Sequence, residues 1–132
     1  MSHAAQLAAF AGAGPLAEME HLGPHRQIEL LMGGLLSRIA GLRHALRQTK
    51  PQARREDADR ALAILAYLRT ILDPKADPKL VGQLDSLYRY CEGRILIACA
   101  ERNEAALLEV AGLITSIKQA WEAIAPQPAV AA

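Results

Sequence analysis

Residues 84–124 read LDSLYRYCEGRILIACAERNEAALLEVAGLITSIKQAWEAI, and this stretch decides the fold. Two apolar patterns with helical spacing meet at Asn103, which predicts two helices joined by a tight turn. In the second arm, apolar residues recur at steps of three and four, as in a packed bundle helix: Leu107, Val110, Ile114, Ile117, Trp121 and Ile124. Further apolar residues lie beside this stripe, namely Leu87, Tyr88, Leu108 and Leu113. This surplus predicts that one half of the hairpin binds something besides the core.

The same spacing precedes the hairpin. It predicts helices over residues 24–49 and 52–72, in addition to 78–102 and 104–124 in the hairpin. Pro51 ends the first helix, and Asp73-Pro74 and Asp77-Pro78 predict a tight loop, because a residue before proline is pushed out of the α region. Short connections make sequential helices antiparallel neighbours. We therefore expect an all-α fold, an antiparallel up-and-down four-helix bundle.

The chain divides into one domain and two flanking segments. We expect residues 1–23 to form a flexible N-terminal leader or cap, because small residues dominate there and glycine and proline interrupt them. Residues 24–124 form the bundle, and residues 125–132, with Pro126 and Pro128, form a short disordered tail. The 132 residues suffice for one core without disulfides or metals.

Composition narrows the functional classes. The chain is 52% hydrophobic but only 4% aromatic, which is typical of helices packed on helices. A net charge of +1 gives no overall field for nucleic acid or an anionic membrane, and no apolar run reaches the ~20 residues of a membrane span. Cys91 and Cys99, eight residues apart on one helix, lie about 12 Å apart, too far for a disulfide. With no basic segment before Arg26 to start a secretory signal, we expect a cytoplasmic protein.

The sequence offers no catalytic constellation. His21 and His25 have a spacing that metal sites use, but Gly23-Pro24 interrupts the helix that would align them. A di-metal bundle needs Glu-x-x-His on two helices, and the chain has one such pair, Glu18 with His21, in the leader. The basic residues of 38–60 spread over a helix end and a loop, with Glu56, Asp57 and Asp59 adjacent and no aromatic residue interleaved, which favours a solvated surface over a nucleic-acid site. We therefore expect no catalytic residue, no metal and no cofactor.

Gly33-Gly34, with Gly41 further on, interrupts a strongly periodic helix. Each interior glycine costs about 1 kcal/mol relative to alanine, so another backbone is expected to approach closely there. That backbone belongs either to a neighbouring bundle helix or to a bound segment that docks over Leu30, Leu31 and Gly34.

The order of the motifs resembles that of the flagellar secretion chaperones, the FliS family. Residues 23–34, GPHRQIELLMGG, are similar to the start of that family's first bundle helix. The hairpin continues the likeness with Leu84-x-x-Leu87-Tyr88-x-Tyr90, Arg94-Ile95-Leu96, Ala100-x-x-Asn103, Leu108-Glu109-Val110-x-Gly112-Leu113-Ile114 and Ala120-Trp121. Gly23, Met32, Gly33 and Phe10 depart from the family's pattern, so hydrogen bonds through those side chains do not carry over.

This resemblance implies a non-enzymatic cytoplasmic chaperone. It would bind the C-terminal segment of flagellin, prevent premature polymerisation and deliver flagellin to the flagellar export gate. The resemblance further implies that Leu7 and Phe10 form an N-terminal cap that also contacts the export gate. The client-binding residues that we expect are Ile28, Leu31, Met32, Gly34 and Leu35 on the first helix, supported by Leu87 and Tyr88.

Other interpretations of the sequence remain possible functions of the chain. A helical-bundle metal enzyme, a paralogue with a different client and a basic regulator of nucleic acid are the alternatives. A homodimer is also compatible with the sequence.

Overall fold

The computed structural model describes residues 22–124, and all structural statements refer to this part of the chain. It contains the α-helices α2 (Pro24–Arg47), α3 (Pro51–Thr70), α4 (Pro78–Glu101) and α5 (Glu104–Ala123), and no described residue lies in a strand. Each helix begins and ends within two residues of the position expected from the sequence. The prediction of an all-α fold is confirmed.

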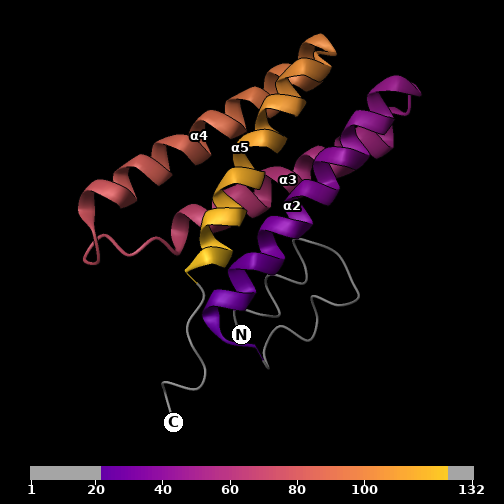
Figure 1. Cartoon of the computed structure of the whole chain (residues 1–132). Coiled ribbons are helices and arrows are strands. Elements are labelled where there is room, and N and C mark those ends of the chain that lie inside the picture. The colour runs from indigo at the N-terminus through magenta and orange to yellow at the C-terminus, as the bar shows by residue number, and fades with distance from the viewer. Residues whose placement is uncertain (1–21, 125–132) are drawn as a thin grey trace.

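The helices form an antiparallel up-and-down bundle (Figure 1). Sequential helices are neighbours, and α5 also packs on α2, which closes the ring. The four-helix bundle is therefore confirmed. Leu7, Phe10, Glu18 and His21 and the tail 125–132 lie outside the described residues, so the expectations for them stay predictions.

Local sequence signals account for the helix starts. Pro24, Pro51 and Pro78 each occupy the first turn of a helix, where the missing N–H removes no hydrogen bond. The Asp77 side chain caps α4 by accepting from the Leu80 N–H, and the Asn103 side chain caps α5 by accepting from the Ala106 N–H; both distances are 3.2 Å. These caps explain why the two arms of the hairpin begin at these residues.

Apolar side chains from all of these helices form one core. No described polar or charged residue is buried. The largest fully buried side chains are Leu31, Met32, Leu35, Ile39, Leu42, Ile64, Leu65, Leu68, Ile95 and Leu107. The periodic stripes of the sequence thus point inward, as the bundle requires. None of the helices in the described part of the chain is long and apolar enough to cross a membrane.

Candidate functional site

The burial of apolar side chains differs between the two ends of the bundle. Tyr88 is the first buried residue of α4, and Ile114 is the last buried residue of α5. The first ten residues of α4 and the last nine of α5 therefore contribute no buried side chain to the core. Figure 1 shows why, because α4 leans away from α5 toward its N-terminal end.

The first turns of α2, the first ten residues of α4 and residues 113–121 of α5 carry apolar side chains that are only partly buried. We call them the open end: Ile28, Leu84, Leu87, Leu113, Ile117 and Trp121. Leu80 and Ile124 flank them and are 49% and 67% exposed. Completing the burial of one such leucine or isoleucine side chain yields at most about 1 kcal/mol, roughly a third of what full burial gives. A partner that covers several of these side chains at once gains a sizeable part of a binding free energy.

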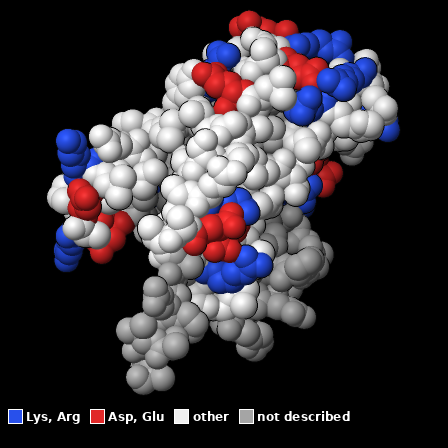
Figure 2. Space-filling view, in the orientation of Figure 1, with Lys and Arg blue, Asp and Glu red and all other residues white. Residues whose placement is uncertain are grey.

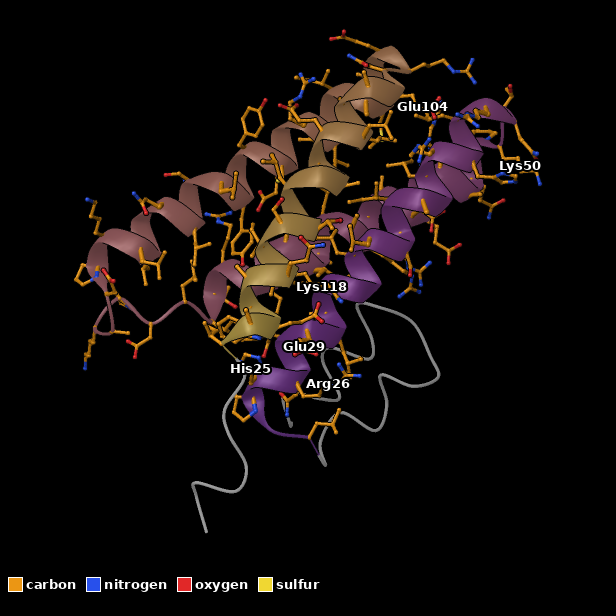
Figure 3. The ribbon with its side chains drawn as sticks, viewed as in Figure 1. His25, Arg26, Glu29, Lys50, Glu104 and Lys118 are labelled. Atoms are coloured by element: carbon orange, nitrogen blue, oxygen red, sulfur yellow. The ribbon has the colours of Figure 1, made fainter. Side chains whose placement is uncertain are left out.

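Trp121 fixes one side of the open end. Its ring stacks on His25, with centroids 4.5 Å apart and planes at 9°. Its Nε1 donates a hydrogen bond of 2.8 Å to the His25 carbonyl oxygen, which ties the last turn of α5 to the first turn of α2. Next to this contact Glu29 accepts from Arg26 and lies 3.5 Å from His25 Nε2 (Figure 3). The α2–α5 side is therefore held together, while the α4 side diverges.

The opposite end of the bundle is tied by charged groups. Glu104, at the start of α5, accepts from Arg43 at 2.9 Å and from Arg47 at 2.6 Å. Arg102 joins the two turns by donating to the Leu46 carbonyl oxygen at 3.2 Å. The hydrogen bonds from Arg47 and Arg43 lower the pKa of the Glu104 carboxyl, so it is a carboxylate at neutral pH. We call this the closed end.

A neutral surface extends between the two ends. Figure 2 shows charged side chains gathered near both ends of this face and none across its middle. Residues 30–37 of α2 and 110–117 of α5 carry no Asp, Glu, Lys or Arg. Such a surface suits an apolar segment, because no charge loses its water when the segment binds.

At Gly33 and Gly41 of α2, the nearest described atoms belong to side chains and not to another backbone. A Cβ at Gly33 would meet only the Lys118 Cε, at 3.9 Å. A Cβ at Gly41 would lie 2.7 Å from the Asp57 carboxylate, which accepts from Arg38. The expected close approach of a neighbouring helix backbone is wrong at Gly33, and at Gly41 the closest group is a side chain. Gly41 instead makes room for an ion pair between α2 and α3.

The residues expected to bind a client separate into two groups. Leu31, Met32, Leu35 and Tyr88 are at most 3% exposed and belong to the core, so a client cannot touch them while the bundle stays closed. They occupy the inward stripe, whose spacing also made them prominent in the sequence. The other expected client contacts are at least partly accessible: Ile28 and Leu87 in the open end, and Gly34 in the middle of α2.

Sequence reasoning missed part of the open end. Ile117 and Trp121 belong to the packing stripe that the sequence predicts, and Leu84 lies on the corresponding stripe of α4, but these three side chains are only partly buried. Leu113, which the sequence marked as surplus, is half-buried there. The signal in the sequence was the loop expected around Asp73-Pro74, because the α3–α4 connection, residues 71–77, is the longest of the three.

Four of the seven Arg and Lys residues of 38–60 form ion pairs. Arg38 bonds Asp57, Arg43 and Arg47 bond Glu104, and Arg60 lies 3.7 Å from Glu56. Within residues 22–124 no group of three or more His, Cys, Asp or Glu side chains is placed to hold a metal ion.

Comparison with known proteins gives consistent matches. The sequence model of the family described as flagellar protein FliS matches residues 12–128. A flagellar secretion chaperone FliSB of Pseudomonas aeruginosa is 33% identical over 82% of this chain and 86% of its own length. A flagellar secretion chaperone FliS of Salmonella typhimurium is 32% identical over 79% of this chain and 78% of its own. The corresponding chaperone of Vibrio cholerae is 27% identical over 84% and 82% of the two chains.

Proposed function

The chain belongs to the FliS family of flagellar secretion chaperones, and we propose that it binds the C-terminal segment of flagellin in the cytoplasm before export. Binding keeps flagellin from polymerising prematurely, and the complex then delivers it to the flagellar export gate. The activity is one of binding and release, with no chemical step.

The open end supports this proposal most directly. A flagellin terminus that has not yet assembled is a disordered segment with one apolar face, and it pays ordering entropy when it becomes helical. Side chains on α4 and α5 that pack against the core are only partly buried, and their exposed area is free for apolar contact with a partner. A helix laid along Leu84, Leu87 and Leu113 would complete the packing that is missing where α4 leans away.

The neutral surface of α2 and α5 extends this contact. Ile28 lies in the open end near the start of α2, and Gly34 lies further along the same helix. A client segment too long for one short groove follows this face without meeting an unpaired charge. We therefore place the client contacts at Ile28, Gly34, Leu87 and the remaining residues of the open end.

In this proposal, the N-terminal leader, residues 1–23, takes part in the release of the client. Leu7 and Phe10, which the family resemblance marks as an N-terminal cap, compete with the client for the open end and contact the export gate. Deleting residues 2–16 is expected to strengthen client binding and to weaken delivery to the gate.

Isothermal titration calorimetry tests the proposal with matched variants on one helix. The probe is the C-terminal peptide of the flagellin encoded in the same genome. We expect one-to-one binding that Leu113→Ser weakens by about tenfold, because a half-buried leucine contributes roughly 1–2 kcal/mol to such a contact. Leu108→Ser, at a residue 50% exposed and five positions earlier in α5, is the control and is expected to change affinity less than twofold.

Circular dichroism checks that both variants stay helical. Absence of binding heat at tens of micromolar, or equal losses in both variants, would contradict the proposal. Binding of another exported flagellar subunit in place of flagellin would assign the chain to a different client. Sedimentation of the free chain tests the homodimer that the sequence left open.

A further inference from the structure

A second apolar groove lies between α3 and α4, at the closed end. It encloses about 390 Å³ and is open to solvent along its length. Its lining on α3 runs from Pro51 to Leu62, which corresponds to about 17 Å, or three helical turns. This groove therefore differs in both helices and position from the neutral surface of α2 and α5.

The groove has an apolar floor and ridge. Leu62 packs half-buried against the core, and Ala58 and Ala100 leave space beside it. Leu96 stands on the α4 side and is 57% exposed, the highest value among the large apolar side chains of α2, α3 and α4. An exposed leucine above small residues is the surface that an apolar helix stripe can cover.

The rim of the groove is positively charged. Arg54 and Arg55 line it, and neither guanidinium bonds a carboxylate in the described part of the chain. Arg102 lines an adjoining hollow that shares Arg54, and its guanidinium donates only to oxygens of Leu46 and Thr49. Asp59 is the acidic residue of the rim. The rim therefore retains an excess of positive charge whose guanidinium groups bond no carboxylate, whereas Arg43 and Arg47 nearby both pair with Glu104.

We propose that the α3–α4 groove docks an amphipathic helix of a second protein, one that carries an apolar stripe bordered by acidic residues. The stripe covers Leu96 and Leu62, and the acidic border pairs with Arg54 and Arg55. Because the open end lies on other surfaces of the bundle, client and second partner bind at the same time. This site does not depend on the client being flagellin.

Cys99 supplies a reporter inside the groove. It lines the floor and is half-buried, whereas Cys91 is fully buried in the core. Burial raises the pKa of both thiols, that of Cys91 to about 11, and only Cys99 is partly exposed, so a maleimide at pH 8 reacts slowly and at Cys99. A helix seated in the groove must slow this reaction.

The experiment uses the full chain and three fluorescein-labelled peptides of equal length. The first has leucines at helical spacing bordered by glutamates, the second replaces the glutamates with lysines, and the third scrambles the first. We expect saturable binding of the first peptide alone by fluorescence anisotropy. Leu96→Ser and the double variant Arg54→Glu/Arg55→Glu are each expected to weaken it by about tenfold. Leu113→Ser, at the open end, is expected to leave it unchanged.

The same peptide must slow maleimide labelling of Cys99 at least about fivefold at saturation. Leu96, Arg54 and Arg55 are at least partly exposed, so these variants are expected to keep their helicity and thermal midpoint. Equal binding of acidic and basic peptides, unchanged affinity in both groove variants, or unaltered Cys99 labelling would overturn the proposal. A dimer of the free chain that Leu96→Ser dissolves would overturn it too, by assigning the groove to a second copy.

Discussion

The two ends of the bundle are built from the same helices in different ways. At the closed end, Glu104 joins two arginines and Arg102 bonds the facing turn, and the buried side chains of α2, α4 and α5 continue almost to the chain reversals. At the open end, a stacked Trp121 holds α5 to α2, while α4 diverges and leaves its apolar side chains half covered. The difference shows how one hydrophobic pattern can serve both as a scaffold and as a binding surface. The closed end carries the stability, and the open end keeps apolar area for a partner.

The largest effect that separates the ends is the cost of deleting a leucine side chain. Leu107→Ala, at a fully buried position of α5, is expected to lower the free energy of unfolding by about 3 kcal/mol. Leu113→Ala, half-buried six residues later, is expected to cost about 1 kcal/mol, because less area leaves a covered environment. Urea unfolding followed by circular dichroism measures both. Equal losses would mean that the open end is packed as tightly as the closed end.

A smaller effect tests the anchor of the open end. Trp121→Phe removes the Nε1–H that bonds the His25 carbonyl oxygen and is expected to cost about 1 kcal/mol. Tyr90→Phe is the control, since it also deletes one hydrogen bond, to Glu109, but at a residue 46% exposed. Urea unfolding compares the two variants. A loss in Trp121→Phe no greater than in Tyr90→Phe would show that α5 is not fastened to α2 through this contact.

The smallest expected effect is the loss of thermal stability at acid pH. The arginines hold the pKa of Glu104 below its ordinary value, and the pKa of Asp85 is lowered mainly by Arg69. A carboxyl whose pKa is lower in the folded state contributes stability above its unfolded pKa of about 4, and this contribution disappears as pH falls through the folded pKa. The thermal midpoint should therefore fall below about pH 4.

The variant Glu104→Gln tests how much of this fall in thermal midpoint comes from the ion pairs of the closed end. We expect it to lower the midpoint at pH 7 by about 2 °C and to reduce the further fall on acidification. Thermal scans at pH 7 and pH 3 measure both quantities. The same acid sensitivity in Glu104→Gln as in the unaltered chain would exclude the arginine–glutamate contact as its source.

The helices could be predicted from the sequence because each signal was local. The stripe of α5, the capping residues Asp77 and Asn103, and proline in the first turn of the other helices are all readable without a structure. They fix where each helix starts and which face it buries.

The candidate site was less predictable because it depends on the distance between helices. Leu84 and Cys91 lie on the same stripe of α4, yet one is half-buried and the other fully buried, since α4 approaches the bundle only from its middle onward. The spacing of apolar residues shows which face of a helix points toward the core, but not how closely that helix approaches its neighbours. For the same reason Leu31, Met32 and Leu35 looked like client contacts and turned out to be core. The groove between α3 and α4 could not be predicted from the sequence either, because its lining comes from two segments about forty positions apart.

The central claim is that the open end receives the client while the closed end holds the fold. Hydrogen–deuterium exchange of the full chain, free and saturated with the flagellin C-terminal peptide, tests it most directly. We expect slower exchange on binding in residues 78–87 and 113–123, and no change around Thr49 and Arg102 at the closed end. Protection confined to the closed end, or absent from the first half of α4, would contradict the account.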